Sequence, residues 1–243
     1  MIADGAINKV EQKDAFHGRP ERFKPTWSLA RHGLRLRVWR DPWIAREYRA
    51  FYEHRSIRFV VFDGANRILA TGVFVEWTWG LPGSNPDDDL PDMDGFSRAC
   101  DGRSHSDFTM ATAIRRGWAA LEPETPLHYG NVVRLDRICI EWKAAAHSAA
   151  IWQFIDDLIK REFRTTTRNR RASIIVLKAF PLEYENKDDL TAEDEAAFKR
   201  RQRAMMRLYQ HRLRAREFDG GERGWMWIEV NCDQPRPVLR IVT

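Results

Sequence analysis

A run of small residues at positions 143–150, KAAAHSAA, carries the strongest chemical signal in the sequence. It follows an apolar strand-like run and leads directly into an amphipathic segment, so it marks the start of a helix. The unpaired amides and about half a positive charge at a helix N-terminus attract phosphate. Lys143 and His147 add side-chain donors. The small residues that let a bulky anion approach are Ala144, Ala145, Ala146, Ser148, Ala149 and Ala150. The run predicts either a phosphate site or an ordinary strand-to-helix connection.

A second signal is the concentration of positive charge between residues 199 and 216. The chain as a whole has a formal net charge of +5, which suits an acidic partner such as nucleic acid or a phosphorylated cofactor. The pattern predicts either a solvated helix face or a surface that contacts phosphates. The cations are Lys199, Arg200, Arg201, Arg203, Arg207, Arg212, Arg214 and Arg216.

The overall composition narrows the class of protein. The 243 residues are 43% hydrophobic, which predicts one domain at residues 28–243 behind a basic N-terminal tail at residues 1–27. No apolar run approaches the roughly 18 residues of a membrane span, and no apolar leader opens the chain. The three cysteines and seven histidines show no metal-ligand spacing. We therefore expect a cytoplasmic protein with no metal and no membrane contact.

The N-terminal half of the chain predicts strands around one helix and one long loop. We expect a strand at 34–39, a helix opened by Asp41 and Pro42, and a hairpin of strands 57–62 and 67–79. An acidic loop then spans residues 80–107. The buried face of the helix would consist of Ile44, Tyr48, Phe51 and Tyr52.

The C-terminal half alternates helices with strands, and the whole order predicts an α/β or α+β sheet covered by helices. A helix capped by Ser106 or Asp107 comes first, and a long basic helix precedes the last strand. The long helix would end before Gly220 and Gly221, with Phe198, Met205, Leu208 and Tyr209 on its inner stripe. The expected elements are the helix from 106 to about 121, a strand at 132–142, a helix after 143–150, a central strand at 171–180, the long helix at 192–218, and a strand at 224–230.

From residue 34 to residue 230 this order resembles the GNAT acyltransferase superfamily. The resemblance is carried by RLDRICIEW with the turn and helix after it, by VLKAFPLEYE, and by MMRLYQHRLRAREF before WMWIEV. It implies a single domain with a mixed, mostly antiparallel central sheet. It also implies that the strand before the turn splays from its neighbour and holds the pantetheine arm of acetyl-CoA or another acyl-CoA.

The resemblance assigns the acyl-CoA contacts to the end of that strand and to the turn, where the pyrophosphate would lie. The family's turn usually reads Arg/Gln-x-x-Gly-x-Gly/Ala, whereas residues 145–150 read AAHSAA and only the final alanine fits. The turn is therefore degenerate, and anion binding would depend on backbone amides. The contact residues would be Ile138, Cys139, Ile140, Lys143, Ala145, His147, Ser148, Ala149 and Ala150.

The resemblance also implies a catalytic acid and a base. Tyr209 matches the tyrosine that protonates the departing CoA thiolate, and a phenol with a pKa of about 10 suits that role. A purely structural place in the core is its alternative. The base facing the amine would be Asp136 or Glu141, which a regular strand points to opposite faces, with Glu76 as a third candidate. Asp136 is favoured, and an ion pair with a neighbouring arginine is its alternative.

We therefore expect an enzyme, an N-acyltransferase that moves an acyl group from acyl-CoA to an unidentified amine by direct attack. A variant within the same fold is an autoinducer-synthase-like enzyme, whose glutamate and serine positions hold Arg134 and Asp136 here. Two other classes stay open: a catalytically silent GNAT-like binding module, and a protein that binds nucleic acid, such as tRNA, through residues 199–216.

Overall fold

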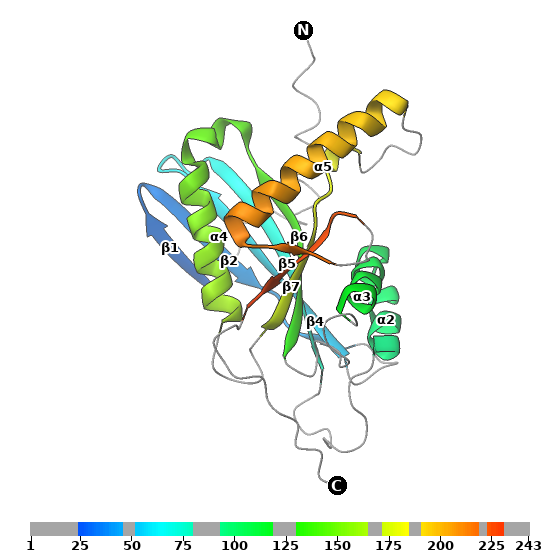
Figure 1. Cartoon of the computed structure of the whole chain (residues 1–243). Coiled ribbons are helices and arrows are strands. Elements are labelled where there is room, and N and C mark those ends of the chain that lie inside the picture. Colours follow the sequence, from blue (N-terminus) through cyan, green and yellow to red (C-terminus); the bar gives the residue numbers. More distant parts are fainter. Residues whose placement is uncertain are drawn as a thin grey trace.

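The structure is a sheet with helices on both faces (Figure 1). The computed structural model describes residues 24–45, 52–79, 93–118, 130–164, 172–184, 191–218 and 223–230. In chain order the strands are β1 (Trp27–Arg31), β2 (Leu34–Arg40), β3 (Ile44–Ala45), β4 (Tyr52–Phe62), β5 (Ile68–Trp79), β6 (Asn131–Ile140), β7 (Ala172–Lys178), β8 (Arg216–Glu217) and β9 (Trp225–Glu229). The helices are α2 (Met93–Asp101), α3 (His105–Trp118), α4 (Ser148–Phe163) and α5 (Ala192–Leu213), with 3-10 turns η3 (Trp142–His147) and η5 (Leu182–Tyr184).

The nine described strands form one sheet in the order β1-β2-β4-β5-β6-β7-β9-β8, with β3 added beside β4. Among these strands only β6 and β7 pair in parallel, and every other pair is antiparallel. A parallel pair needs a crossover connection, which η3 and α4 provide. The expected mixed, mostly antiparallel sheet flanked by helices is confirmed.

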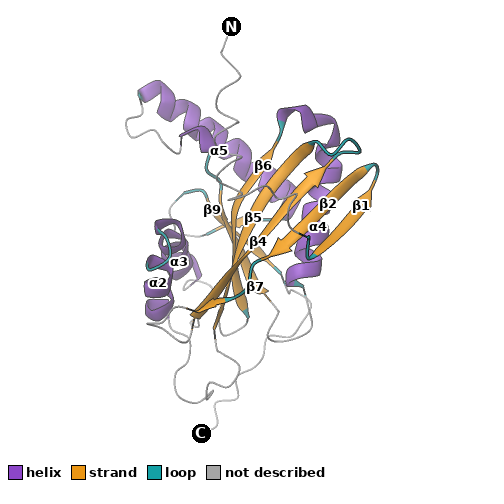
Figure 2. Cartoon of the chain, turned by 180° about the vertical axis from the view of Figure 1, so that it is seen from behind, coloured by secondary structure: helices purple, strands orange, loops and turns teal. Residues whose placement is uncertain are grey.

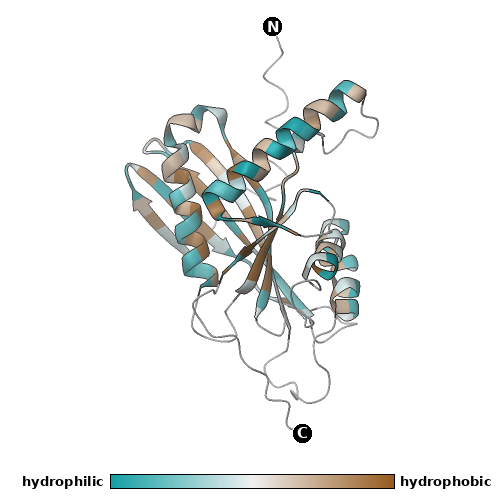
Figure 3. Cartoon of the chain, viewed as in Figure 1, coloured by the Kyte–Doolittle hydropathy of each residue, from teal (hydrophilic) through white to brown (hydrophobic). Residues whose placement is uncertain are grey.

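Helices α4 and α5 cover one face of the sheet, and α2 and α3 cover the other, as Figure 1 and the opposite view in Figure 2 show. Ile151 and Phe163 of α4 pack with Phe59 and Phe74 of the sheet in the first layer. On the opposite face of the sheet, the buried side chains of α2 and α3 pack against Trp77 and its neighbours. The strands between the two layers are strongly hydrophobic, whereas much of α5 is hydrophilic (Figure 3).

The helix expected after Asp41 and Pro42 is wrong where the structure describes it. Ile44 lies in β3 and pairs with His54, and Tyr52 begins β4 opposite Trp79. Residues 46–51, which include the other two expected core positions, lie outside the described residues. Positions 44, 48 and 52 have the spacing of one helix face, but Ile44 and Tyr52 lie in two different strands, β3 and β4, which pair antiparallel with each other. Ile44 is 49% exposed, whereas Tyr52 is buried.

The acidic segment expected as a loop at residues 80–107 is helical in its described part. α2 and the start of α3 occupy residues 93–101 and 105–107, and residues 80–92 lie outside the described part. Phe96, Ala99 and Cys100 share one buried face of α2, a helical spacing that the surrounding aspartates obscured. α3 begins before the expected caps, because the hydroxyl of Ser104 accepts the amide of Asp107 at 3.1 Å.

Two expected boundaries also move. β1 begins at Trp27, inside the expected tail, and its indole N–H donates to buried Glu162 of α4 at 2.5 Å. α5 ends at Leu213, and not near residue 218, because Arg214 adopts a left-handed conformation with φ 56°. Within α5 the buried residues include Met206, while Leu208 is 40% exposed and not part of the inner stripe. Residues 1–23, the end of the helix near 121, and Gly220 and Gly221 lie outside the described residues.

Gly72 of β5 lies in close contact with its neighbours in the sheet. A methyl group there would overlap the ring of Phe59 and lie 2.8 Å from the carbonyl oxygen of Arg137. We expect Gly72→Ala to lower the free energy of unfolding by about 1–3 kcal/mol, because overpacking forces neighbours to move. Urea denaturation of the whole chain measures this change.

Gly64→Ala, in the turn between β4 and β5, is the matched control. Its added methyl meets only the carbonyl oxygen of Gly33, at 3.7 Å, which is an ordinary contact, so the change should stay within about 0.5 kcal/mol. Equal effects of the two substitutions would contradict the close packing at Gly72.

Candidate functional site

The parallel strands β6 and β7 part beyond their last pair, Leu135 with Leu177. β6 continues to Ile140 and stays paired with β5, whereas β7 ends one residue later, at Lys178. No described strand pairs with the β7-facing edge of β6 over residues 136–140. An edge with no neighbouring strand can accept an extended ligand that carries amide groups. We call this region the β6–β7 gap, and it is the candidate site.

A β-bulge at Asp136 marks the point where the strands part. Arg137 pairs with Val73, and Leu135 pairs with the next residue, Phe74, so Asp136 has no partner on β5. A bulge bends its strand and increases the local twist, which gives a physical reason for β6 to leave β7 here. The alternation that would send Asp136 and Glu141 to opposite faces does not apply across such an irregularity.

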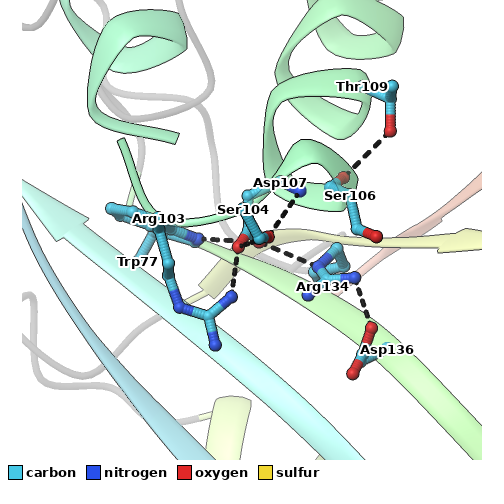
Figure 4. Close-up of polar contacts among 8 residues, drawn as sticks. All are labelled: Trp77, Arg103, Ser104, Ser106, Asp107, Thr109, Arg134 and Asp136. Carbon is cyan, nitrogen blue, oxygen red and sulfur yellow. Dashed lines mark hydrogen bonds and ion pairs between the residues drawn. The ribbon is translucent and has the colours of Figure 1, made fainter. Parts of the chain in front are cut away.

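Asp136 belongs to a polar cluster between β6 and the first turn of α3 (Figure 4). Arg134 of β6 bonds Asp136 through Nη1 and Asp107 through Nε, at 2.9 Å from Oδ1. Asp107 also accepts the hydroxyl of Ser104 at 2.6 Å and a guanidinium hydrogen bond from Arg103. The ion pair expected as the alternative role of Asp136 is therefore present, and the cluster attaches α3 to the strand at its bulge.

Asp107 is fully buried, and its neighbours stabilise its negative charge. Burial alone would raise the pKa of Asp107, but the positive charges of Arg134 and Arg103 and the hydroxyl of Ser104 hold that pKa below its usual value. The carboxylate therefore stays ionised at neutral pH. A permanent negative charge at this point fixes Arg134 and, through it, the carboxylate of Asp136.

Tyr209 lies on the other side of the sheet, on the inner face of α5. It is buried and meets the ring of Trp152 of α4 edge-on, with ring centroids 6.3 Å apart. Burial, together with the nearby thiol of Cys139, raises the pKa of Tyr209 to about 12. The phenol thus keeps its proton at neutral pH, and it lies close enough to β6 for Cys139 to affect it. These two expected site residues therefore lie within electrostatic range of each other.

The small-residue run after β6 is compact. Residues 142–147 form η3, and α4 follows without a break. The amide of Ala144 bonds the carbonyl oxygen of Glu141 at 2.8 Å, and the amide of Ser148 bonds that of Ala145. These two amides are thus already used within the turn. The side chains of Lys143 and His147 are exposed, as are Ala145 and Ala149, while Ser148 and Ala150 are half-buried.

The remaining expected residues fall into two groups. Ile138 and Ile140 are partly buried against the core under α4, and Glu141 is half-buried where β6 ends. Glu76 is fully buried and away from the gap, opposite Val133 on the first half of β6. Burial raises the pKa of Glu76, although its bonds to Arg55 and Asn131 oppose that rise. The pairing favours a structural role for Glu76.

Three features of the site were not predicted from the sequence. The first is the Asp107–Arg134 bond, since its carboxylate lies in a segment that was expected to be a loop. The second is Lys178, which follows the last β6–β7 pair and pairs with Trp225 of β9. The third is the indole Nε1 of Trp225, which is buried and has no hydrogen-bond partner in the described part of the chain. An unpaired buried donor beside the end of β7 suits a ligand oxygen, and no sequence pattern indicates it.

The described residues contain neither a candidate metal site nor a helix that could cross a membrane. Within residues 24–230, apart from the gaps given above, no group of three His, Cys, Asp or Glu side chains is placed to hold a metal ion. Among the described helices, none is long and apolar enough to cross a membrane.

Comparison with known proteins gives no relative from which a function can be transferred. No protein-family model matches the chain, and no curated protein shows significant sequence similarity to it. The function must therefore be argued from the site itself.

The buried carboxylate of Asp107 gives the site a testable stability contribution. We expect Asp107→Asn to lower the free energy of unfolding by about 3–5 kcal/mol at pH 7, because it removes the buried charge that Arg103 and Arg134 both contact and leaves buried Arg134 with Asp136 alone. The folded pKa is lowered, so the wild-type contribution is present above the unfolded value and is lost as the pH falls through the folded one. The stability of Asp107→Asn should therefore fall less between pH 5 and pH 2, as measured by urea denaturation.

Asp94→Asn provides the matched control, since Asp94 forms a solvent-exposed ion pair with Arg115. This pair should contribute no more than about 1 kcal/mol. If Asp107→Asn were no more destabilising than Asp94→Asn, the cluster would not hold α3 against β6.

Proposed function

We propose that this protein is an acyl-CoA-dependent N-acyltransferase with a GNAT-like fold, using acetyl-CoA or another acyl-CoA and an amine. The observation that carries the proposal is the β6–β7 gap, which has Tyr209 on its α4–α5 side and the bulged Asp136 on its α2–α3 side. The parting of one parallel pair next to a following helix is the arrangement that the resemblance implies. An extended pantetheine arm, with its two amide groups, suits the part of β6 that has no strand beside it on the β7 side.

In the proposed reaction Tyr209 is the acid. The amine nitrogen bonds to the thioester carbonyl carbon and the carbon–sulfur bond breaks. Tyr209 then donates its hydroxyl proton to the thiolate that leaves. A pKa of about 12 keeps this proton in place over the pH range in which an amine is a nucleophile. Backbone amides of β6 beside the gap are suited to stabilise the carbonyl oxygen as negative charge develops on it.

A carboxylate near the gap takes the proton that the amine loses. Asp136 lies on the opposite side of the sheet from Tyr209 and is held by Arg134, so an amine bound there would be attracted to a fixed negative charge. Glu141, at the end of β6, is the second candidate. Trp225 Nε1 is a further donor on this side and suits an oxygen of the acceptor substrate.

Phosphate contacts would come from the exposed side chains at the start of α4. Because two amides of the turn are used internally, Lys143 and His147 supply the charge and donors that the glycine-rich loop supplies in the family. This departure also favours a second candidate function, a catalytically silent GNAT-like module that binds a ligand in the gap without acyl transfer.

Calorimetric titration of the whole chain with acetyl-CoA tests binding, and mass spectrometry of amine mixtures tests transfer. We expect Tyr209→Phe to keep acetyl-CoA affinity within about threefold, a factor worth roughly 0.7 kcal/mol, and to lower kcat by about 100-fold or more, because it removes a general acid. The thermal midpoint should change little, since the ring stays in place.

Tyr184→Phe is the matched control. Tyr184 is also buried, but it packs against Phe198 near the start of α5, and its removal should leave kcat unchanged. No heat with millimolar acetyl-CoA would remove the proposal. Binding without transfer to any amine would favour the silent module.

A further inference from the structure

α5 carries a row of positive charge along the side that faces away from the sheet. Arg200, Arg203, Arg207 and His211 are spaced three, four and four residues apart, which places them on one side of α5, and Arg214 comes directly after the last turn of the helix. All five are exposed. We call this row the α5 stripe. At 1.5 Å per residue its helical part, from Arg200 to His211, is about 17 Å long.

The stripe is not neutralised by its surroundings. Between Ala196 and Arg216 the sequence contains no Asp or Glu, so no acidic residue of the helix interrupts the row. The ion pairs of this helix lie beside the stripe: Lys199 bonds Glu195 at 3.3 Å, and Arg201 bonds Glu183. In the described part of the chain, Arg200, Arg207 and Arg214 form no ion pair, and Arg203 donates only to the carbonyl oxygen of Lys199, at 3.1 Å.

The opposite side of α5 is already occupied. Gln202, Met206, Tyr209 and Leu213 are buried, and Met206, Tyr209 and Leu213 lie in the core under the helix. A helix that lies in a membrane surface needs its apolar face free for the lipid, so α5 is unsuited to that role. The stripe offers charge alone.

The chemistry of the stripe favours a phosphodiester backbone. Guanidinium groups bind phosphate oxygens with paired hydrogen bonds. The stripe contains no Phe, Tyr or Trp, so it lacks the rings on which single-stranded bases stack. A duplex carries one negative charge per 1.7 Å of its axis, so about five base pairs span the helical part of the stripe. Four arginines in a row can meet such a backbone without reading its sequence.

We propose that the α5 stripe binds the sugar–phosphate backbone of double-stranded nucleic acid independently of sequence. The proposal does not depend on acyl transfer, because the stripe lies on the side of α5 away from the β6–β7 gap. Four phosphate contacts give a log–log salt slope near −3.6 on a B-form duplex, at about −0.9 per contact. Affinity should therefore fall roughly 150-fold between 50 and 200 mM salt.

Fluorescence anisotropy of the whole chain with labelled 20-base-pair DNA and RNA duplexes tests the proposal. The stripe variant carries Arg200→Gln, Arg203→Gln, Arg207→Gln and Arg214→Gln. At 50 mM salt we expect it to bind at least 100-fold more weakly than wild type and to lose most of the salt slope. Two unrelated duplex sequences should give the same affinity. The DNA and RNA arms show which duplex the protein prefers.

A charge-matched control removes four exposed cations elsewhere: Arg98→Gln, Arg116→Gln, Lys160→Gln and Arg164→Gln. Both variants lower the formal net charge of +5 by four. The control should keep duplex affinity within about threefold of wild type. Circular dichroism and thermal melting show that both variants fold. Equal losses in both variants would mean that net charge, and not the stripe, attracts the duplex, and would overturn the proposal.

Two further outcomes would also overturn it. One is stripe-dependent binding to vesicles with anionic headgroups together with no binding to either duplex. The other is competition in which CoA displaces the duplex but dephospho-CoA does not, which would assign the stripe to the 3′-phosphate of the proposed cosubstrate. Acetyl-CoA titration of the stripe variant separates the two proposals, since loss of duplex binding with unchanged acetyl-CoA binding concerns the stripe alone.

Discussion

The parallel pair of β6 and β7, the only one among the described strands, is the constraint on which the rest of the structure depends. Two parallel neighbours cannot be joined by a tight turn, so the chain must leave the end of β6, cross a face of the sheet as η3 and α4, and return at the start of β7. Pairing then runs only from the beginnings of both strands to Leu135 and Leu177. Beyond that pair β6 bends at its bulge toward β5, while the amide of Ala179 bonds Gly224 of the β9 side at 2.8 Å. The end of β6 therefore bonds β5, and the end of β7 bonds the β9 side, so that the β6–β7 gap lies between them.

Buried carboxylates help to hold the helices and strands of this fold against one another. Asp107 and Glu76 are both buried carboxylates, yet the pKa is lowered in the first and raised in the second. The difference lies in the number of cations: Asp107 meets two arginines, whereas Glu76 meets one arginine and an amide. A carboxylate that stays charged can orient Arg134 on the site side. Glu76 instead links β4, β5 and β6 at the far end of the sheet.

Much of this fold follows from local sequence patterns, and the site follows only in part. The strand-like runs at residues 57–62 and 67–79, with turn residues 63–66 between them, indicated the β4–β5 hairpin, and the apolar stripe after residue 150 indicated α4. The segment at 44–52 has a helical spacing of apolar residues, but its ends lie in β3 and β4, which pair with each other. At the site, the resemblance to the GNAT superfamily indicated Asp136 and Tyr209. The bulge, the Asp107–Arg134 bond and the unpaired Trp225 indole depend on contacts between segments far apart in the chain, which no local pattern contains.

Both proposals depend on the helical period of α5, which determines where Tyr209 and the α5 stripe lie. A capping box at Thr191 and Asp194 fixes where the helix begins, and the left-handed Arg214 fixes where it ends. Between them each residue turns the helix by about 100°, so the rotation that buries Met206, Tyr209 and Leu213 also turns the α5 stripe outward. A slip of one residue would move Tyr209 away from the gap and break up the stripe at the same time. The charge pattern and the phenol are therefore set by the same packing against α4 and the sheet, although one faces solvent and the other faces the core.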